Sequence, residues 1–453
     1  MLDAAGLVEA VTSGAIDTVL VAFPDLQGRL VGKRVTGSYW CDHMDGGTEP
    51  LHMCNYLLAV DSEMNVLPGY TFASWEQGYG DMATQPDLAT IREVPWLDKT
   101  ALVLCDLLDE ETGAPVEVSP RRILQRQVER AAAAGFTLKF ASELEFFVFR
   151  ESLEEAAAKD YAGLTPHSLV IEDYHILQTT REEYLIRDMR NGIDCAGVPV
   201  EFSKGEAGRG QHELNLTYLD ALAMADANAV FKNAVKEIAA IHGRAVTFMA
   251  KYSFDDTGSS CHIHSSLWHG HESLMADDHG PHHMSDTFRW YLGGLVATAR
   301  EFSLLFAPTV NSYRRFQHGS WAPTGLAWGI DNRTLGFRIV GHGRSMRVES
   351  RIPGADANSY HAFAAIIAGG LYGIRNRIEP PPIYEGNGYE ATDIERVPWN
   401  IADAIALWRD SAVAEECFGA DVHQHVLNFA EQEWRAFNQT VTDWELKRYF
   451  ERI

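Results

Sequence analysis

The sequence lacks the cysteine patterns that disulfide frameworks and structural zinc sites require. Its six cysteines are scattered without CxxC spacing: Cys41, Cys54, Cys105, Cys195, Cys261 and Cys417. The pattern argues against a zinc site and against a disulfide-stapled scaffold, and it indicates a reducing compartment.

Membrane, targeting and basic segments are scarce as well. No apolar run approaches the roughly 20 residues of a membrane-spanning helix. The first residues, MLDAAGLVEAVTSG, lack a basic segment followed by an apolar core, so no signal peptide is predicted. Lys and Arg total 38 against 63 Asp and Glu, a formal net charge of −25. This acidity argues against nucleic acid and anionic membranes as partners. Because neither a signal peptide nor a membrane span is predicted, we expect a cytoplasmic protein.

What the chain contains is ordinary globular composition over 453 residues, enough for two or more domains. Residues 17–35 read as a strand, a turn and a returning strand, and residues 101–107 as another strand. Ser119 and Pro120 then begin a helix that ends at a glycine. Further along, we expect strands at 139–150, 245–252 and 260–268, helices at 220–243 and 360–374, and a solvated loop at 277–283.

Glutamates are spaced as if to meet at one point. Glu143 and Glu145, in SELEFF, lie two residues apart on a predicted strand and therefore share a face. Such like charges repel unless a cation or water separates them, and the neighbouring phenylalanines predict partial burial. Glu206 and Glu213 flank a glycine-rich turn in GEAGRGQHE, and Glu349 lies in MRVESRIPG.

Histidines and arginines complete this pattern. His262 and His264 share one face of the strand in TGSSCHIHSS. Five glutamates and one imidazole suit Mg²⁺ or Mn²⁺ better than a structural zinc. The arginines gather in the C-terminal half, and Arg is the preferred residue for a two-donor grip on carboxylate or phosphate. Metal ligands and arginines together indicate phosphoryl transfer from a nucleotide.

The order of these motifs resembles the glutamine synthetase family. Glu-x-Glu-Phe, Gly-Gln-x-Glu, Gly-Ser-x-x-His-x-His-x-Ser, Asn-Ser-Tyr-x-Arg, Asn-Arg-Thr and Arg-x-Glu-x-Arg follow one another from about residue 15 to the C-terminus. The resemblance implies an α+β fold, with an N-terminal β-grasp domain at 1–112 and a catalytic domain at 113–453 built on an open, curved antiparallel sheet. It also implies a dodecamer of two hexameric rings, with active sites between neighbouring subunits.

The same resemblance assigns roles residue by residue, with two or three Mg²⁺ or Mn²⁺ ions and ATP in each site. The first metal site is implied at Glu145, Glu206 and Glu213, and the second at Glu143, His262 and Glu349. The glutamate-binding set is Glu145, Gly258, His262, Arg315, Arg333 and Arg351. The ATP-binding set is Glu201, His264, Ser266, Arg338 and Arg344. Residues implied to act in catalysis are Arg315, Arg333 and, on the flap, Trp321.

Trp321 is itself a departure from the family pattern. Members that use ammonia carry a glutamate at this position, which takes a proton from ammonium. They also carry an acid in the N-terminal domain, where this sequence has Pro68 and Gly69, and an asparagine where it has Thr257. Tryptophan offers a flat apolar wall and one N–H donor, and it cannot act as a base.

We interpret the departures as a changed nucleophile, a primary amine in place of ammonia; neutral drift in a loop is the alternative. The pattern then resembles the actinobacterial γ-glutamyl-amine ligases of the γ-glutamylethanolamide synthetase type. Ethanolamine is the expected acceptor, because a polyamine would need further acids for its extra charges. Glu63, Glu76 and Asp81 would reverse that choice if they lay nearby. Glutamine synthetase using ammonia, a γ-glutamylpolyamine synthetase and a non-catalytic regulatory relative remain as alternatives.

Overall fold

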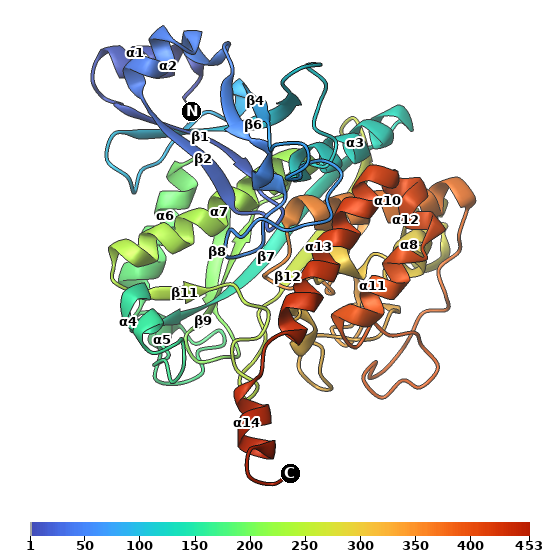
Figure 1. The fold of residues 1–453 in the computed structure, drawn as a ribbon. Helices are drawn as coiled ribbons and strands as arrows, with labels where there is room; N and C mark the ends of the chain where they lie inside the picture. Colours follow the sequence, from blue (N-terminus) through green and yellow to red (C-terminus); the bar gives the residue numbers. More distant parts are fainter. Residues whose placement is uncertain (1) are drawn as a thin grey trace.

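A computed structural model describes residues 2–453 and contains two sheets with helices packed around them (Figure 1). The first sheet has the strand order β2-β1-β6-β4-β3, with β5 pairing β6. Its β1 and β6 run parallel and its other pairs antiparallel. The strands are β1 (Thr18–Pro24), β2 (Leu30–Thr36), β3 (Leu51–Cys54), β4 (Asp81–Pro86), β5 (Arg92–Glu93) and β6 (Thr100–Asp109). The strands predicted at 17–35 and 101–107 are confirmed.

The second sheet carries the candidate site and has the order β14-β15-β16-β12-β7-β9-β8. All its pairs are antiparallel except β14 with β15. The strands are β7 (Thr137–Phe149), β8 (Val200–Gly205), β9 (Gln211–Leu216), β10 (Leu219–Asp220), β11 (Ala245–Thr247), β12 (Cys261–His269), β13 (Glu272–Ser273), β14 (Trp328–Ile330), β15 (Phe337–Val340) and β16 (Arg347–Ser350). The α+β class is confirmed, whereas the division at residue 112 stays a prediction.

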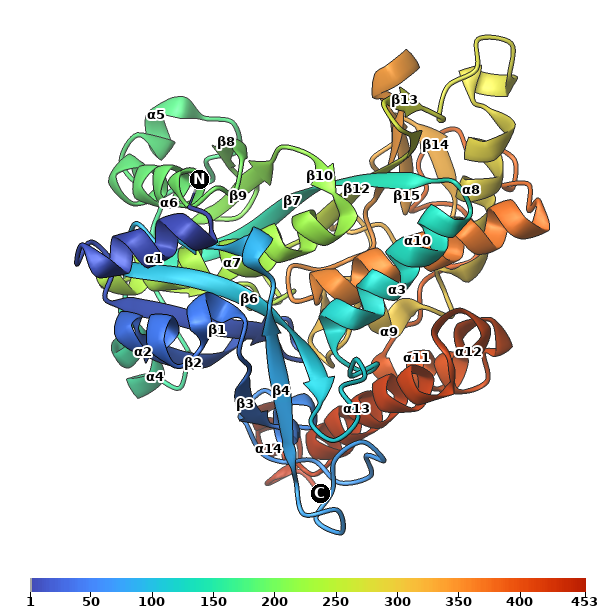
Figure 2. The same cartoon turned by 90° about the horizontal axis from the view of Figure 1, so that it is seen from above.

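Helices cover one side of this second sheet. The helix α3 (Pro120–Ala133) begins as predicted, because the Ser119 side chain accepts a hydrogen bond from the Arg122 amide and Pro120 occupies the first turn. It lies beside α10 (Ser359–Asn376), and α7 (Ala221–Ile241) runs along β7 (Figure 2). Glycines let α10 approach α8 (Asp286–Thr298) closely: a Cβ on Gly294 would lie 2.1 Å from the Gly369 carbonyl oxygen.

The remaining helices surround these layers and the N-terminal sheet. They are α1 (Ala4–Thr12), α2 (Gly37–Asp42), α4 (Leu153–Ala158), α5 (Ile176–Thr179), α6 (Glu183–Cys195), α9 (Ser303–Phe306), α11 (Ile401–Arg409), α12 (Ala412–Phe418), α13 (Ala420–Asn438) and α14 (Asp443–Tyr449). Figure 1 shows α14 standing away from the body with the C-terminus at its end. Within residues 2–453, no helix combines the length and apolar character needed to cross a bilayer.

One predicted strand is shorter than expected. Residues 245–252 were predicted as a strand, but β11 ends at Thr247. Beyond it the chain bonds to loops instead of to β7: the Lys251 amide donates to Asn311 Oδ1 and the Ala250 carbonyl accepts from Ser259. Tertiary partners therefore override the strand propensity of this segment.

Candidate active site

Strand register gathers the polar side chains into three rows across one face of the second sheet. Because neighbours in register lie close together, residues far apart in sequence meet there. The rows are Lys204, Glu213 and Glu145; Asn215, Glu143 and His262; and His264, Glu349 and Arg338.

Two overlapping groups of these residues have the composition of a divalent-metal site. Each brings its ligand atoms within 4.8 Å of one another: Glu143, His262 and Glu349, and Glu145, Glu213 and His262. The His262 Nδ1 atom donates to Glu143 at 3.1 Å, so Nε2 carries the free lone pair. That Nε2 is buried and has no hydrogen-bond partner among the described residues. A hard divalent cation with carboxylate and imidazole ligands fits this donor set.

Burial and neighbouring negative charges raise the pKa values of the carboxylates in this group. Burial, and then the charge of Glu206, raise the pKa of Glu145 to about 8. Burial, followed by the charges of Glu143 and Glu145, raises the pKa of Glu213 to about 10. A bound cation would favour the ionised forms that are penalised here.

Glu206, the third predicted ligand of the first metal site, lies slightly apart from that group. Its carboxylate is ion-paired with Lys204 and accepts the Ala207 amide at 3.1 Å. The Lys204 ammonium also lies 3.8 Å from Glu213. The Lys204 ammonium therefore contacts two of the carboxylates, Glu206 and Glu213, that are predicted to bind the metal.

The three arginines predicted to bind glutamate differ in burial and in their hydrogen-bond and ion-pair partners. Arg315 is buried, and its guanidinium donates to Ser260 Oγ at 2.9 Å and to the Ile352 carbonyl at 2.8 Å. Burial lowers its pKa to about 10. Arg351 pairs with Glu349, but its buried Nε has no hydrogen-bond partner among residues 2–453. Arg333 is exposed, so of the three its side chain is the freest to move towards a ligand.

A cavity of about 350 Å³, here called the Trp321 cavity, opens over the metal-type carboxylates. It is lined by the three arginines above, by Gly258 and by Arg338, which was predicted to contact ATP. Gly258 is required by close approach, because a Cβ there would lie 2.8 Å from the Ala250 carbonyl oxygen. Trp321 forms part of the wall and is 59% exposed, with its backbone in the left-handed region at φ +59°.

A second cavity of about 480 Å³, the His264 cavity, adjoins the first and shares Glu143, Phe202 and Asn215 with it. It is lined by four of the predicted ATP-binding residues, Glu201, His264, Ser266 and Arg344.

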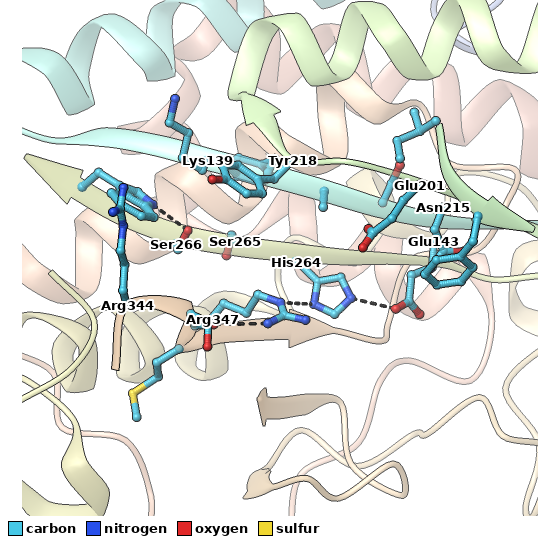
Figure 3. Close-up of a pocket in the computed structure, with 18 residues that line it drawn as sticks. Lys139, Glu143, Glu201, Asn215, Tyr218, His264, Ser265, Ser266, Arg344 and Arg347 are labelled. Atoms are coloured by element: carbon cyan, nitrogen blue, oxygen red, sulfur yellow. Dashed lines mark hydrogen bonds and ion pairs between the residues drawn. The ribbon is translucent and has the colours of Figure 1, made fainter. Parts of the chain in front are cut away.

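Figure 3 shows how the charged groups of the His264 cavity connect. Arg347 Nε donates to His264 Nδ1 at 3.2 Å, and His264 Nε2 donates to Glu143 at 2.9 Å. Arg344 lies over the Trp268 ring at 5.3 Å from its centroid. A flat aromatic surface beside arginines suits a stacked base and a string of phosphates.

Sequence reasoning missed several residues that line the two cavities. In the His264 cavity they include Lys139 and Tyr218, and in the Trp321 cavity Asp173, Tyr174 and Lys204. Lys204 had a usable signal, since it stands two residues before Glu206. Asp173 had none, because only the tertiary fold brings its loop to the site.

Comparisons with known proteins match the whole chain to one family. Residues 117–449 match the model of the glutamine synthetase catalytic domain. The chain is 49% identical to a γ-glutamylethanolamide synthetase of Streptomyces coelicolor, over 98% of this chain and 94% of that protein. It is 36% identical to a glutamate–isopropylamine ligase of a Pseudomonas species, covering 97% and 96% of the two chains. A solved structure of a GmaS/ADP complex superposes with a TM-score of 0.85 at 27% identity, covering 100% of both chains.

Proposed function

The chain belongs to the glutamine synthetase family, and from that premise we propose that it joins the γ-carboxylate of L-glutamate to a small primary amine, ethanolamine in particular. It is a ligase of the glutamate–amine type. The finer proposal concerns the acceptor, the intermediate and the residues that hold each substrate.

The proposed chemistry proceeds through γ-glutamyl phosphate. A carboxylate is a poor electrophile because oxide would have to leave. Transfer of the γ-phosphoryl group of ATP forms a carboxylate O–P bond and breaks the bond to ADP. The amine nitrogen then attacks the acyl carbon, a C–N bond forms, phosphate leaves, and the nitrogen gives up a proton. Phosphate thus replaces oxide as the leaving group.

The two adjoining cavities divide these tasks. We assign ATP to the His264 cavity, with Glu201, His264, Ser266 and Arg344 around it, and with Arg338 at the boundary. We assign glutamate to the Trp321 cavity, with Gly258, Arg315, Arg333 and Arg351. Glu143 lies on the shared wall, where the transferred phosphoryl group would pass.

Mg²⁺ or Mn²⁺ fits between these substrates. The ions would be held by Glu143, Glu145, Glu206, Glu213, His262 and Glu349. Bound there, they would neutralise the charge of the phosphates and of the substrate carboxylate. The chain's own contribution is the orientation of this ligand set, in which Glu143 fixes the His262 ring through Nδ1.

The observation that carries the choice of an amine is Trp321 in the wall of the cavity. The position holds an aromatic ring in the same cavity as the metal-type carboxylates, where an ammonia-using member would have an acid, and this supports phosphoryl transfer with a different acceptor. A substrate that brings an apolar tail can pack against this ring.

We also propose a dodecamer that works in the cytoplasm. The helix α14 stands off from the body and exposes Trp444 and Leu446, and Phe450 just beyond it is exposed too. Exposed apolar side chains on a projecting helix are typical of a docking segment. The six cysteines are all free thiols, which suits a reducing compartment.

A phosphate-release assay tests the proposal. Purified protein with ATP, Mg²⁺ and glutamate is given ammonium, ethanolamine, isopropylamine, putrescine or spermine in turn, with glutamate omitted as the control. We expect glutamate-dependent release that is fastest with ethanolamine. Fastest release with ammonium would make the protein a glutamine synthetase, fastest release with spermine would make it a polyamine ligase, and no release would make it non-catalytic.

A further inference from the structure

The segment 171–175 contributes Asp173 and Tyr174 to the lining of the Trp321 cavity, and the Tyr174 amide donates to the Gly205 carbonyl at 3.4 Å. Ile171 forms a β-bridge with Arg209. Glu172 is buried against Gly205, where an added Cβ would lie 2.6 Å from the Glu172 Cβ. Asp173 follows directly, is exposed, and lines the cavity. Its carboxylate is thus presented from a firmly anchored turn.

Two aromatic residues line the cavity together with this carboxylate. Tyr174 has φ +57° and Trp321 has φ +59°, both in the left-handed region that bulky side chains rarely adopt. Both rings line the same cavity. Strained aromatic residues that persist on one cavity indicate that the surrounding fold holds them there. The cavity thus offers two aromatic side chains together with the Asp173 carboxylate.

The other carboxylates of the cavity are already engaged. Five carboxylates line it: Glu143, Glu145, Asp173, Glu206 and Glu213. The four glutamates belong to the metal-type set, and Lys204 is occupied by two of them, Glu206 and Glu213. Asp173 has no ion-pair partner among residues 2–453 and belongs to no metal-type group. It is the one negative charge left for a substrate.

We propose that Asp173 binds the ammonium group of the acceptor amine and positions it beside the acyl phosphate, where the nitrogen attacks after one of its protons has passed to solvent. The inference rests on the proposed function and names the residue that recognises the acceptor. A protonated primary amine is a cation with three N–H donors, and a carboxylate gives it a charge-assisted hydrogen bond. One available carboxylate suits a monoamine, because a polyamine would leave further ammonium groups without partners. Trp321, in the wall of the same cavity, then covers the short carbon chain.

The test replaces Asp173 by Asn and measures two reactions on the intact oligomer. The first is amide formation with ethanolamine, for which we expect the KM for the amine to rise at least about tenfold, as the loss of a charge-assisted hydrogen bond would produce. The second is positional isotope exchange in ATP, which reports glutamyl phosphate formation with glutamate alone and needs no amine. We expect that exchange to stay within about twofold of wild type, because the substitution leaves the binding of ATP and glutamate unchanged.

Two comparisons make the result specific. The matched control is Asp255→Asn, which removes an exposed negative charge near residue 257 without touching the cavity, and it should leave the amine KM unchanged. Hydroxylamine, which is uncharged at mildly alkaline pH, should lose much less in Asp173→Asn than ethanolamine does.

The outcomes separate the inference from its premise. An unchanged KM for ethanolamine, an equal loss with hydroxylamine, or a loss of isotope exchange in Asp173→Asn would overturn the role of Asp173. Absence of glutamate-dependent exchange in the wild type would instead overturn the proposed function.

Discussion

Glu213 is surrounded by charge on both sides in the β9 strand, with Glu145 opposite it on β7 and Lys204 opposite it on β8. Its pKa is raised to about 10, first by burial and then by the charges of Glu143 and Glu145. The surroundings of this one residue would therefore favour an added cation.

The Glu213→Gln variant tests this claim. The amide keeps the shape of the side chain and removes a hard anionic ligand, so we expect Mn²⁺ affinity to fall by about 100-fold or more and turnover to be lost. Mn²⁺ binding is measured by calorimetry and by electron paramagnetic resonance. The exposed Glu154→Gln serves as the control. Unchanged Mn²⁺ affinity and stoichiometry in Glu213→Gln would remove Glu213 from the metal site.

At this scale, part of the site was predictable and part was not. The alternation of Glu143 with Glu145 and of His262 with His264 follows from the two-residue period of a strand, so shared faces could be predicted. The register that sets Glu143 opposite His262 could not, because it depends on pairing between segments about 120 residues apart. Asp173 was missed because only long-range contacts bring its loop to the Trp321 cavity.

Helix and strand boundaries were likewise predictable where local residues set them and unpredictable where distant contacts do. The start of α3 was readable from Ser119 and Pro120, whose effects are local. The end of β11 was not, because Lys251 bonds to Asn311, 60 positions away. The helix α13 joins distant parts of the chain in a way that can be tested: His425 Nε2 donates to the Leu58 carbonyl at 2.9 Å.

We predict that α13 makes the protein sensitive to acid. Burial lowers the pKa of His425 to about 4, and burial followed by the charge of His425 lowers that of His361 to about 3. In the unfolded chain these imidazoles take up protons below about pH 6.5, whereas in the folded chain they stay neutral down to their lowered pKa values. The free energy of unfolding should therefore fall as pH drops from about 6.5 towards 4, by about 1.4 kcal/mol per pH unit for each histidine.

The His425→Gln variant isolates this effect, since its amide can still donate to Leu58. Unfolding midpoints measured between pH 7 and 4.5 should fall less steeply than in the wild type, by about one proton's contribution. The exposed His279→Gln is the control and should keep the wild-type slope. A wild-type slope in His425→Gln as well would show that other groups cause the acid sensitivity.

The candidate metal site lies in a strongly acidic protein with a net charge of −25. The cations of the site are local: arginines from the C-terminal half face carboxylates from β7, β9 and β16 across one sheet. Fold class and family could be predicted from the order of the motifs along the chain. The assembly and the identity of the acceptor stay predictions from the resemblance, because both depend on surfaces that no single motif records.

A competition between acceptors tests the central claim most directly. Wild-type protein is given ATP, glutamate and equal concentrations of ethanolamine and ¹⁵N-ammonium, and the ratio of γ-glutamylethanolamide to labelled glutamine is measured by mass spectrometry. That ratio equals the ratio of the two specificity constants, so binding and chemistry are compared in one vessel. The same measurement on Trp321→Glu restores an acid beside the nucleophile. We predict that the amide of ethanolamine greatly exceeds glutamine in the wild type and that the ratio moves towards glutamine in the variant. Glutamine as the main product of the wild type would contradict the account.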